Sequence, residues 1–410
     1  KDLPRERVVH DLNDADKICA CCGDTLHPVG EEVSEQLDII PAKVRVLQHV
    51  KLKYGCRGCE EGITTAKAPK QPIPGSIASP GTLAYVVTAK YCDALPLYRQ
   101  SVIFGRFGVD IGRSTLSHWM MKSAELLKPL YLAMHRQLLT ESILHADETT
   151  VQVLKEPDKA PESKSYMWLY RTGERSPHPL VLFEYQPGRG RCHPQQFLTG
   201  YSGYLQVDGY SVYDNLKDVI PVGCWAHARR KFDEAIKLLP KDKQKSGKGM
   251  VAISTIQKLY LIEKQAKTLD AVKRKAIRQE QAIPILAGFK EWLEKSAAQG
   301  LPKSKMGSAI GYCLNQWPKL MRYIDDGSLA IDNNIAERDI RPFTTGRKNW
   351  MFSNTPRGAE SSAILYSLVL TARANNLNPY RYLTALFNRL PNLAGDDDLS
   401  GLMPWNITLD

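Results

Sequence analysis

The sequence predicts a multidomain α+β protein with a small cysteine-containing module, a helical region, and a mixed α/β core that carries a large α-helical insertion. Three observations support this class. Two C-x-x-C pairs frame an alternating, β-branched stretch before residue 60. The apolar period then changes from helical spacing to two near residue 143, and helical, lysine-rich sequence returns over 238–325. A chain of 410 residues is also too long for one ordinary hydrophobic core.

The first module has the thiol pattern of a zinc ribbon. The expected ligands of one structural Zn²⁺ are Cys19, Cys22, Cys56 and Cys59, and Gly23 and Gly58 beside them suit tight turns. The stretch between the pairs predicts two or three short strands over 33–54. Cys21 is interpreted as a bystander. Because the nine cysteines are an odd number and unevenly spread, a disulfide framework is not expected.

A linker or extended arm, rich in Pro, Gly and Lys, is predicted over 67–81. The apolar spacing after it predicts helices that are interrupted at Pro96. Ser114 is expected to cap the next helix, which would expose Arg113, Ser117 and His118 at its start. This arrangement resembles a helix-turn-helix. Helical hairpins are also common without DNA, so DNA recognition and plain packing both stay open.

The core begins with strands predicted in "ILHADETTVQVL", "SYMWLYRTG", "HPLVLFEYQ" and "SGYLQVDGYSVYDNL". The segment "VIPVGCWAHARRKF" predicts a short strand that leads into a basic helix. Beyond the helical stretch, Asp332 or Asn333 is expected to cap a helix that Pro342 soon ends. Strand character returns at "NWMFSN", and an apolar helix follows.

Three acidic residues of this core stand out from the rest. Asp147 and Asp208 are each expected to end a strand, and Glu337 to lie on the helix after Asn333. They can converge if the strands are neighbours and the helix packs across them. Such a cluster repels itself unless cations bridge it, and oxygen ligands suit Mg²⁺ or Mn²⁺. Two such ions can promote phosphoryl transfer at a phosphodiester.

Each carboxylate also has an ordinary structural explanation. Asp147 could be a salt-bridged strand end, Asp208 an Asx-turn residue, and Glu337 a partner of Arg341 at i,i+4. The order of the three residues, their element types and their basic surroundings favour the site. Glu148 should point to the opposite face of its strand, as a neighbour of the site rather than a ligand.

Several long motifs occur in a fixed order: "HADETTVQVL", "VDGYSVYDNL", "CWAHARRKF", "DNNIAERDIRPFTTGRKNWMF" and "LMPWN". Together they resemble the insertion-sequence-66 family of bacterial transposases over nearly the whole chain. The resemblance implies a DDE transposase with an RNase H-like core and a zinc ribbon, in which Asp147, Asp208 and Glu337 are the catalytic triad and hold two Mg²⁺ (or Mn²⁺). It also implies a further helical, coiled-coil-prone segment upstream.

The resulting domain boundaries are 1–66 for the zinc ribbon, 67–140 for the linker and HTH-like helices, 141–237 and 326–390 for the two parts of the RNase H-like core, 238–325 for the helical insertion, and 391–410 for a tail. The expected partners are double-stranded DNA at transposon ends and target, further copies of the chain assembled on DNA, and small accessory proteins of the same element. The resemblance implies a bacterial cytoplasmic, nucleoid-associated protein.

Cationic and soft side chains surround the predicted triad. We expect DNA contacts from Arg113, Arg229, Arg230, Arg338, Arg341, Arg347 and Lys348, as phosphate contacts that set position more than sequence choice. For the basic run at 229–231, a solvated face remains an equal alternative. Cys224 and His227 form half of a metal site at best, so a supporting role beside the active site is favoured. Trp225 is expected in the core rather than as a base-stacking wedge.

Composition limits the remaining function classes. Lys and Arg number 55 against 44 Asp and Glu, which gives a net charge of +11 and suggests a polyanionic partner. No apolar run approaches the roughly 18–20 residues of a membrane span. Two rival functions remain open: an RNase H-like nuclease that never joins strands, and a zinc-containing DNA-binding protein whose triad is silent.

Overall fold

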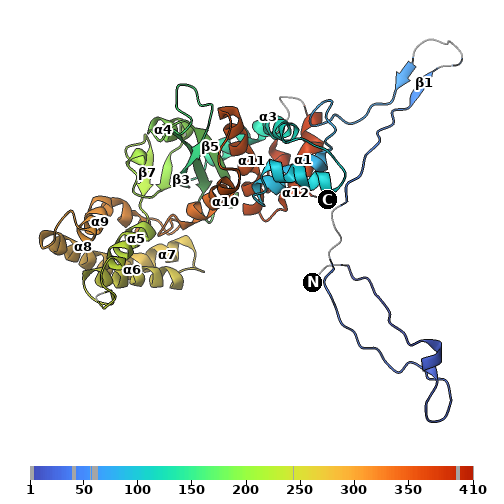
Figure 1. Ribbon diagram of the computed structural model, residues 1–410. Coiled ribbons are helices and arrows are strands. Elements are labelled where there is room, and N and C mark those ends of the chain that lie inside the picture. The colour runs from blue at the N-terminus through green and yellow to red at the C-terminus, as the bar shows by residue number, and fades with distance from the viewer. Residues whose placement is uncertain are drawn as a thin grey trace. The chain divides into compact units, whose positions relative to one another are not determined.

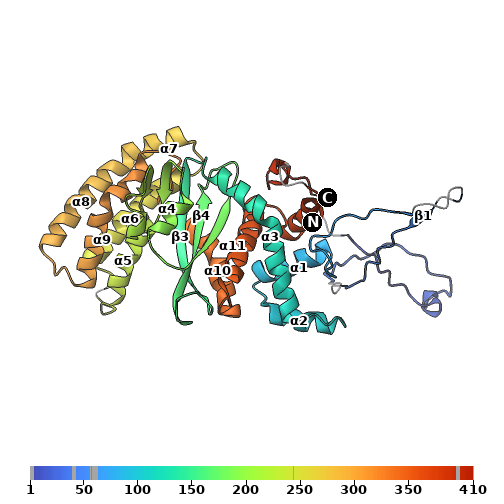
Figure 2. The same cartoon turned by 90° about the horizontal axis from the view of Figure 1, so that it is seen from above.

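The computed structural model describes residues 4–38, 43–55, 57, 63–242, 244–393 and 398–409 (Figures 1 and 2). Contacts within the chain define two compact units, Lys1–Gln48 and His49–Asp410. Among the described residues no helix is both long and apolar enough to cross a membrane.

The first unit contains little regular structure in its described part. A 3₁₀ helix, Asp14–Lys17, precedes a bridge between Ile18 and Thr25. The strands expected over 33–54 were predicted wrongly, because the described residues there form only the start of β1 (Lys53–Gly55), which belongs to the second unit. Alternating apolar residues such as Val46 lie exposed, without a partner strand or core to bury them.

The second unit begins with a hairpin and three helices. β1 pairs antiparallel with β2 (Ile63–Thr65). Helices α1 (Pro80–Tyr91), α2 (Leu97–Arg106) and α3 (Arg113–Leu138) follow, and the break at Pro96 is confirmed. The expected cap at Ser114 is wrong, since Gly112 occupies the N-cap position and Ser114 lies in the first turn. The arm before α1 packs with its Ile73 buried in the main core.

The core is mixed α/β around a five-stranded mixed sheet in the order β5-β4-β3-β6-β7. Its strands are β3 (Ile143–Gln152), β4 (Lys164–Thr172), β5 (Val181–Gln186), β6 (Gly203–Gln206) and β7 (Val219–Val222), as the period-two pattern predicted. β3, β4 and β5 pair antiparallel, whereas β3, β6 and β7 pair parallel. A short helix α4 (Cys192–Phe197) connects the two halves.

One group of helices gathers on the β5 side of this sheet: α1, α3, α10 (Asn334–Trp350), α11 (Pro356–Ala374) and α12 (Pro379–Arg389) (Figures 1 and 2). The edge strand β5 is covered by α11. The hydroxyl of Ser367 accepts the N–H of Phe183 at 2.7 Å, and that of Thr371 accepts the N–H of Val181 at 3.0 Å. These hydroxyls satisfy backbone groups that an edge strand otherwise leaves unpaired.

A second group of helices lies on the β7 side and forms its own hydrophobic core (Figures 1 and 2). It consists of α5 (Trp225–Lys237), α6 (Lys248–Gln265), α7 (Ala271–Ile277), α8 (Ile283–Ala298) and α9 (Lys305–Met321). Trp225 is fully buried there and donates to the carbonyl of Leu320 at 2.9 Å, which confirms the core interpretation of this residue.

The helix α10 differs from its prediction at the C-terminal end. Pro342 lies inside α10, which continues to Trp350. The strand expected at 349–354 is reduced to one bridge, between Ser353 and Val153. Proline removes one N–H donor from the helix interior, a cost that tertiary contacts can offset. Buried Ile340 and Phe343 on either side of Pro342 provide such contacts.

A buried arginine holds the second helical group together. Arg278 is fully buried and forms a two-pronged ion pair with Glu263, at 2.8 and 2.7 Å. The same guanidinium donates to the carbonyls of Tyr323, Asp326 and Leu329. We predict that Arg278→Met lowers the free energy of unfolding by about 3–5 kcal/mol, because it leaves a carboxylate and three carbonyls unpaired.

Urea unfolding followed by circular dichroism measures this loss. The matched control is Lys290→Met, which removes an exposed pair with Glu294 and should change the free energy of unfolding by less than about 1 kcal/mol. Equal losses in the two variants would contradict the structural role of Arg278.

Candidate functional site

Two of the three predicted carboxylates belong to neighbouring parallel strands: Asp147 lies on β3, and Asp208 lies two residues beyond the end of β6. β3 and β6 pair with Leu144 opposite Leu205 and His145 opposite Gln206. Continuing this one-to-one register by two residues brings Asp208 level with Asp147. The expectation that the strand ends at Asp147 is wrong: β3 continues to Gln152, paired with β4. Asp147 instead marks the point where β3 loses its parallel neighbour.

Asp208 also forms the Asx turn that its sequence allowed. Its Oδ1 accepts the backbone N–H of Tyr210 at 2.7 Å, directly after β6. This hydrogen bond fixes the carboxylate at the strand end. One oxygen still has lone pairs free, so the turn and a ligand role are compatible.

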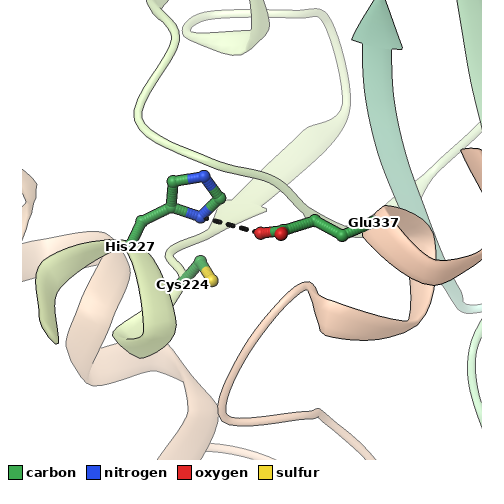
Figure 3. A group of neighbouring side chains, drawn as sticks. All are labelled: Cys224, His227 and Glu337. Carbon is green, nitrogen blue, oxygen red and sulfur yellow. Dashed lines mark ion pairs between the residues drawn. The ribbon is translucent and has the colours of Figure 1, made fainter. Parts of the chain in front are cut away.

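Glu337 comes from the first turn of α10. Its carboxylate pairs with Arg230 of α5 through both oxygens, at 2.9 and 3.2 Å, and lies 3.5 Å from Nδ1 of His227 (Figure 3). The structure therefore gives Glu337 partners on another helix, and the i,i+4 pair with Arg341 is not formed. The sequence between α5 and α10 is long, so only the fold brings these residues together.

Asn333, a buried residue at the N-cap of α10, fixes the helix against β3. Its Nδ2 donates to the carbonyl of Ala146 at 2.8 Å, and its Oδ1 accepts from Nδ1 of His145 at 2.9 Å. Its backbone N–H donates to Sγ of Cys224 at 3.2 Å. The asparagine thus contacts the residue before Asp147, lies four residues before Glu337, and touches the start of α5. Only its place as a helix cap was predicted from sequence.

The rest of α10 is attached to the same antiparallel strands. Arg347 donates to the hydroxyls of Thr149 and Thr150, at 3.2 and 2.9 Å, and to the carbonyl of Thr150. Asp339 accepts from Arg171 of β4 at 2.7 Å, in a pair whose arginine is almost fully buried. These contacts set the height of Glu337 along β3.

The electrostatics of Asp147 reflect this convergence. Burial raises the pKa of Asp147 to about 8, and the neighbouring charges of Glu148, Asp208 and Glu337 act in the same direction. A carboxylate in this position is costly to ionise without a cation nearby. Burial also lowers the pKa of His227, while Glu337 and Asp208 oppose that change. The carboxylates therefore share one electrostatic environment.

Glu148 has its own partners next to the site. Its side chain is almost fully buried, accepts from Nε of Arg189 at 2.9 Å, and is hydrogen-bonded by the hydroxyl of Tyr213. Arg189 also stacks over the ring of Tyr210, with 3.7 Å to the ring centroid. Neither Arg189 nor Tyr213 was identified from the sequence, although Arg189 lies between two glycines in the segment "QPGRGRC".

The cations expected at DNA fall into two groups. The first group has exposed side chains. It consists of Arg113 at the start of α3, and of Arg229, Arg338, Arg341 and Lys348, which lie near the carboxylates in the sequence. Arg230 pairs with Glu337, and Arg347 is half-buried on β3. Ser117 and His118 are exposed beside Arg113.

The sulfur ligands expected for zinc are described only in part. Cys19 and Cys22 lie on a turn in which Gly23, at φ +77°, donates its N–H to the carbonyl of Cys19 at 2.9 Å. Backbone N–H groups of Cys22 and Cys21 lower the pKa of the Cys19 thiol. Cys56 and Cys59 lie outside the described residues, in the connection between β1 and β2.

Cys224 and His227 lie beside Glu337 at the start of α5 (Figure 3). The ligand atoms of the three residues lie within 4.8 Å of one another. Burial raises the pKa of Cys224 to about 12, although backbone N–H groups of Asn333, His227 and Ala226 act against this. Both residues therefore lie next to Glu337, and the supporting role expected for them from the sequence stays a prediction.

Comparison with known proteins gives matches to models of one protein family along most of the chain. A family model described as "Transposase IS66 family" matches residues 75–361. Models for the "zinc-finger binding domain of transposase IS66" and the "IS66 C-terminal element" match 16–60 and 367–405. The uncharacterized protein y4jD of Sinorhizobium fredii is 32% identical over all of this chain and 81% of its own length. Its relative y4qI is 34% identical over 95% of this chain and 74% of its own.

The buried Asn333 should be needed for the geometry around Asp147. We predict that Asn333→Ala lowers the free energy of unfolding by about 2 kcal/mol or more, because it leaves the Ala146 carbonyl and the His145 N–H unpaired. Asn334→Ala is the control, since Asn334 is exposed and the side-chain amide of Asn334 donates to Asp332, two residues before it in the chain. Urea unfolding should separate the two variants, and a small change in both would contradict the positioning role.

The raised pKa of Asp147 predicts a pH-dependent cost in stability. Between its ordinary pKa of 3.8 and about 8, the folded chain keeps a proton on Asp147 that the unfolded chain has lost. The folded state binds more protons, so this residue makes stability fall as pH rises through that window. With a metal chelator present, Asp147→Asn should therefore raise the midpoint temperature of thermal unfolding more at pH values above this window than at pH values below it.

The control for this measurement is Asp233→Asn, which removes an exposed pair with Lys237. Its effect on the thermal midpoint should be small at every pH. If Asp147→Asn gave the same shift throughout the window, the carboxylate would not be the buried, repelled group described here.

Proposed function

This chain belongs to the IS66 family of transposases, and from this premise we propose that it cleaves phosphodiester bonds at transposon ends and joins the 3′-OH ends to target DNA. Asp147, Asp208 and Glu337 are the proposed catalytic residues. One observation supports the assignment above others: residues from two strand segments and a distant helix contribute to a single electrostatic environment, in which the pKa of Asp147 rises to about 8.

We infer that the core is RNase H-like. The strand order β5-β4-β3-β6-β7, antiparallel on one side of β3 and parallel on the other, suits that fold. Helices α6–α9 lie between Asp208 and Glu337 in the sequence, where the family resemblance places its insertion. The α2–α3 pair supports an HTH-like role, because Arg113, Ser117 and His118 are exposed on the first turns of α3.

The carboxylates suit a pair of hard divalent cations, Mg²⁺ or Mn²⁺. Their ligand atoms are oxygens, and added positive charge would offset the burial and the carboxylate repulsion that together raise the pKa of Asp147. When bound, two such ions supply the charge that activates a water or a 3′-OH and stabilises the leaving oxygen. In the chain itself, Asn333 positions the strand and helix that carry Asp147 and Glu337, and Arg230 orients the Glu337 carboxylate.

DNA binding is supported by charge and exposure. The net charge of +11 favours a polyanion, and the exposed cations at 229, 338, 341 and 348 are proposed to contact phosphates. Cys19 and Cys22, with Cys56 and Cys59, are proposed to hold one structural Zn²⁺. Assembly of several copies on DNA, and help from small proteins of the same element, belong to the same proposal.

The test is incubation of the full chain with labelled transposon-end DNA in Mg²⁺ or Mn²⁺, with nicked and joined products resolved. We predict that Asp208→Asn lowers both products on the order of a hundredfold or more, as loss of a transition-state electrostatic contact does. The control is Asp218→Asn, an exposed residue at φ +59°, where asparagine is well tolerated.

The product pattern separates the rival functions. Joined products that disappear only in Asp208→Asn support the transposase. Nicks without joining in the parent would indicate a nuclease. DNA binding without any metal-dependent cleavage, equal in the parent and both variants, would overturn the catalytic assignment.

A further inference from the structure

Soft ligand atoms lie at the edge of the carboxylate site. The thiol of Cys224, the imidazole of His227 and the carboxylate of Glu337 offer one sulfur, one nitrogen and one oxygen, all within 4.8 Å of one another (Figure 3). The first two residues come from the start of α5 and the third from the first turn of α10. Three different kinds of ligand atom thus lie close together at the N-terminal ends of α5 and α10.

Ordinary packing leaves one of these atoms unexplained. Nδ1 of His227 is buried and makes no hydrogen bond in the described part of the chain, although it lies 3.5 Å from Oε1 of Glu337. Sγ of Cys224 is surrounded by backbone N–H groups of Asn333, Ala226 and His227, with Asn333 at 3.2 Å. N–H donors around a sulfur at a helix N-terminus act in favour of its thiolate form, against the burial that raises the pKa of this thiol.

The donor set selects a class of metal. Mg²⁺ requires oxygen ligands, whereas a thiolate, an imidazole and a carboxylate suit Zn²⁺. Zinc bonds of about 2.0–2.3 Å in a tetrahedron place neighbouring ligand atoms about 3.3–3.7 Å apart. The 3.5 Å between His227 and Glu337 already meets this spacing. Small side-chain movements would bring in the sulfur, and water would complete the tetrahedron.

We propose that Cys224, His227 and Glu337 form a second zinc site, and that it shares Glu337 with the Mg²⁺ centre. Zn²⁺ replaces the thiol proton of Cys224, which passes to solvent, and no oxidation is involved. Zinc bound by Cys224 and His227 draws the Glu337 carboxylate toward α5, so zinc and the two-metal centre compete for this side chain. Zn²⁺ is then an inhibitor of cleavage. The sharing rests on the function proposed above, whereas the zinc site does not.

The zinc content of the purified full chain tests the site directly. After equilibration with Zn²⁺ and removal of free metal, elemental analysis should find about one ion per chain fewer in Cys224→Ser and in His227→Asn than in the parent. The control is Cys313→Ser, since Cys313 is equally buried, on α9, and is not part of the cluster. His227→Asn changes a partly exposed residue, so it keeps the test valid if Cys224→Ser folds poorly. Equal zinc content in all four proteins would overturn the site.

Inhibition tests the shared carboxylate separately. Each protein is titrated with Zn²⁺ during Mg²⁺-dependent nicking, relative to its own rate without zinc. We expect half-inhibition of the parent and of Cys313→Ser at a zinc concentration at least about tenfold lower than for Cys224→Ser. If the proteins differ in zinc content but not in the zinc concentration that inhibits them, Glu337 is not shared with the Mg²⁺ centre, and the zinc site itself still stands. If no protein nicks DNA, the proposed function fails, and the zinc content still decides the site.

Discussion

The attachment of α10 to β3 is the constraint on which the carboxylate site depends. The charge of Glu337 acts on Asp147 only while the helix stays at one height along the strand. Asn333 and Arg347 fix the two ends of that contact through hydrogen bonds to β3. The site is therefore held by polar contacts to backbone and hydroxyl groups rather than by apolar packing alone, and such contacts are directional.

The fold places arginine side chains next to some of the carboxylates of this site and thereby compensates part of its negative charge. Arg189 pairs with Glu148, and Arg230 pairs with Glu337, so two of the four acidic groups have an arginine partner. Asp147 accepts only the N–H of Glu148 among the described residues, and burial together with the neighbouring carboxylates raises its pKa. Such uneven compensation suits the metal-dependent centre proposed for these residues.

Much of this arrangement was predictable, but only where the pattern is local. Strand alternation predicted β3 to β7, whereas the assignment of Asp147, Asp208 and Glu337 as the triad, made from motif order, stays a prediction. The ends of elements were less predictable: Pro342 is accommodated inside α10, Ser114 caps nothing, and β3 runs past Asp147 because β4 accompanies it. Partners such as Arg189 for Glu148 depend on which segments the fold brings together, and no local spacing contains that information.

The cover of β5 by α11 has a consequence for the order in which the chain acquires its structure. The N–H groups of Val181 and Phe183 are paired by residues 190 and 184 positions later in the chain. During synthesis the sheet and the helices α5–α9 emerge while this edge still lacks its cover. Contacts of such long range slow folding and leave an open strand edge exposed in the meantime. The newly made chain is therefore most prone to pair with other chains until α11 arrives, and its exposure to aggregation is set by the speed of translation as well as by final stability.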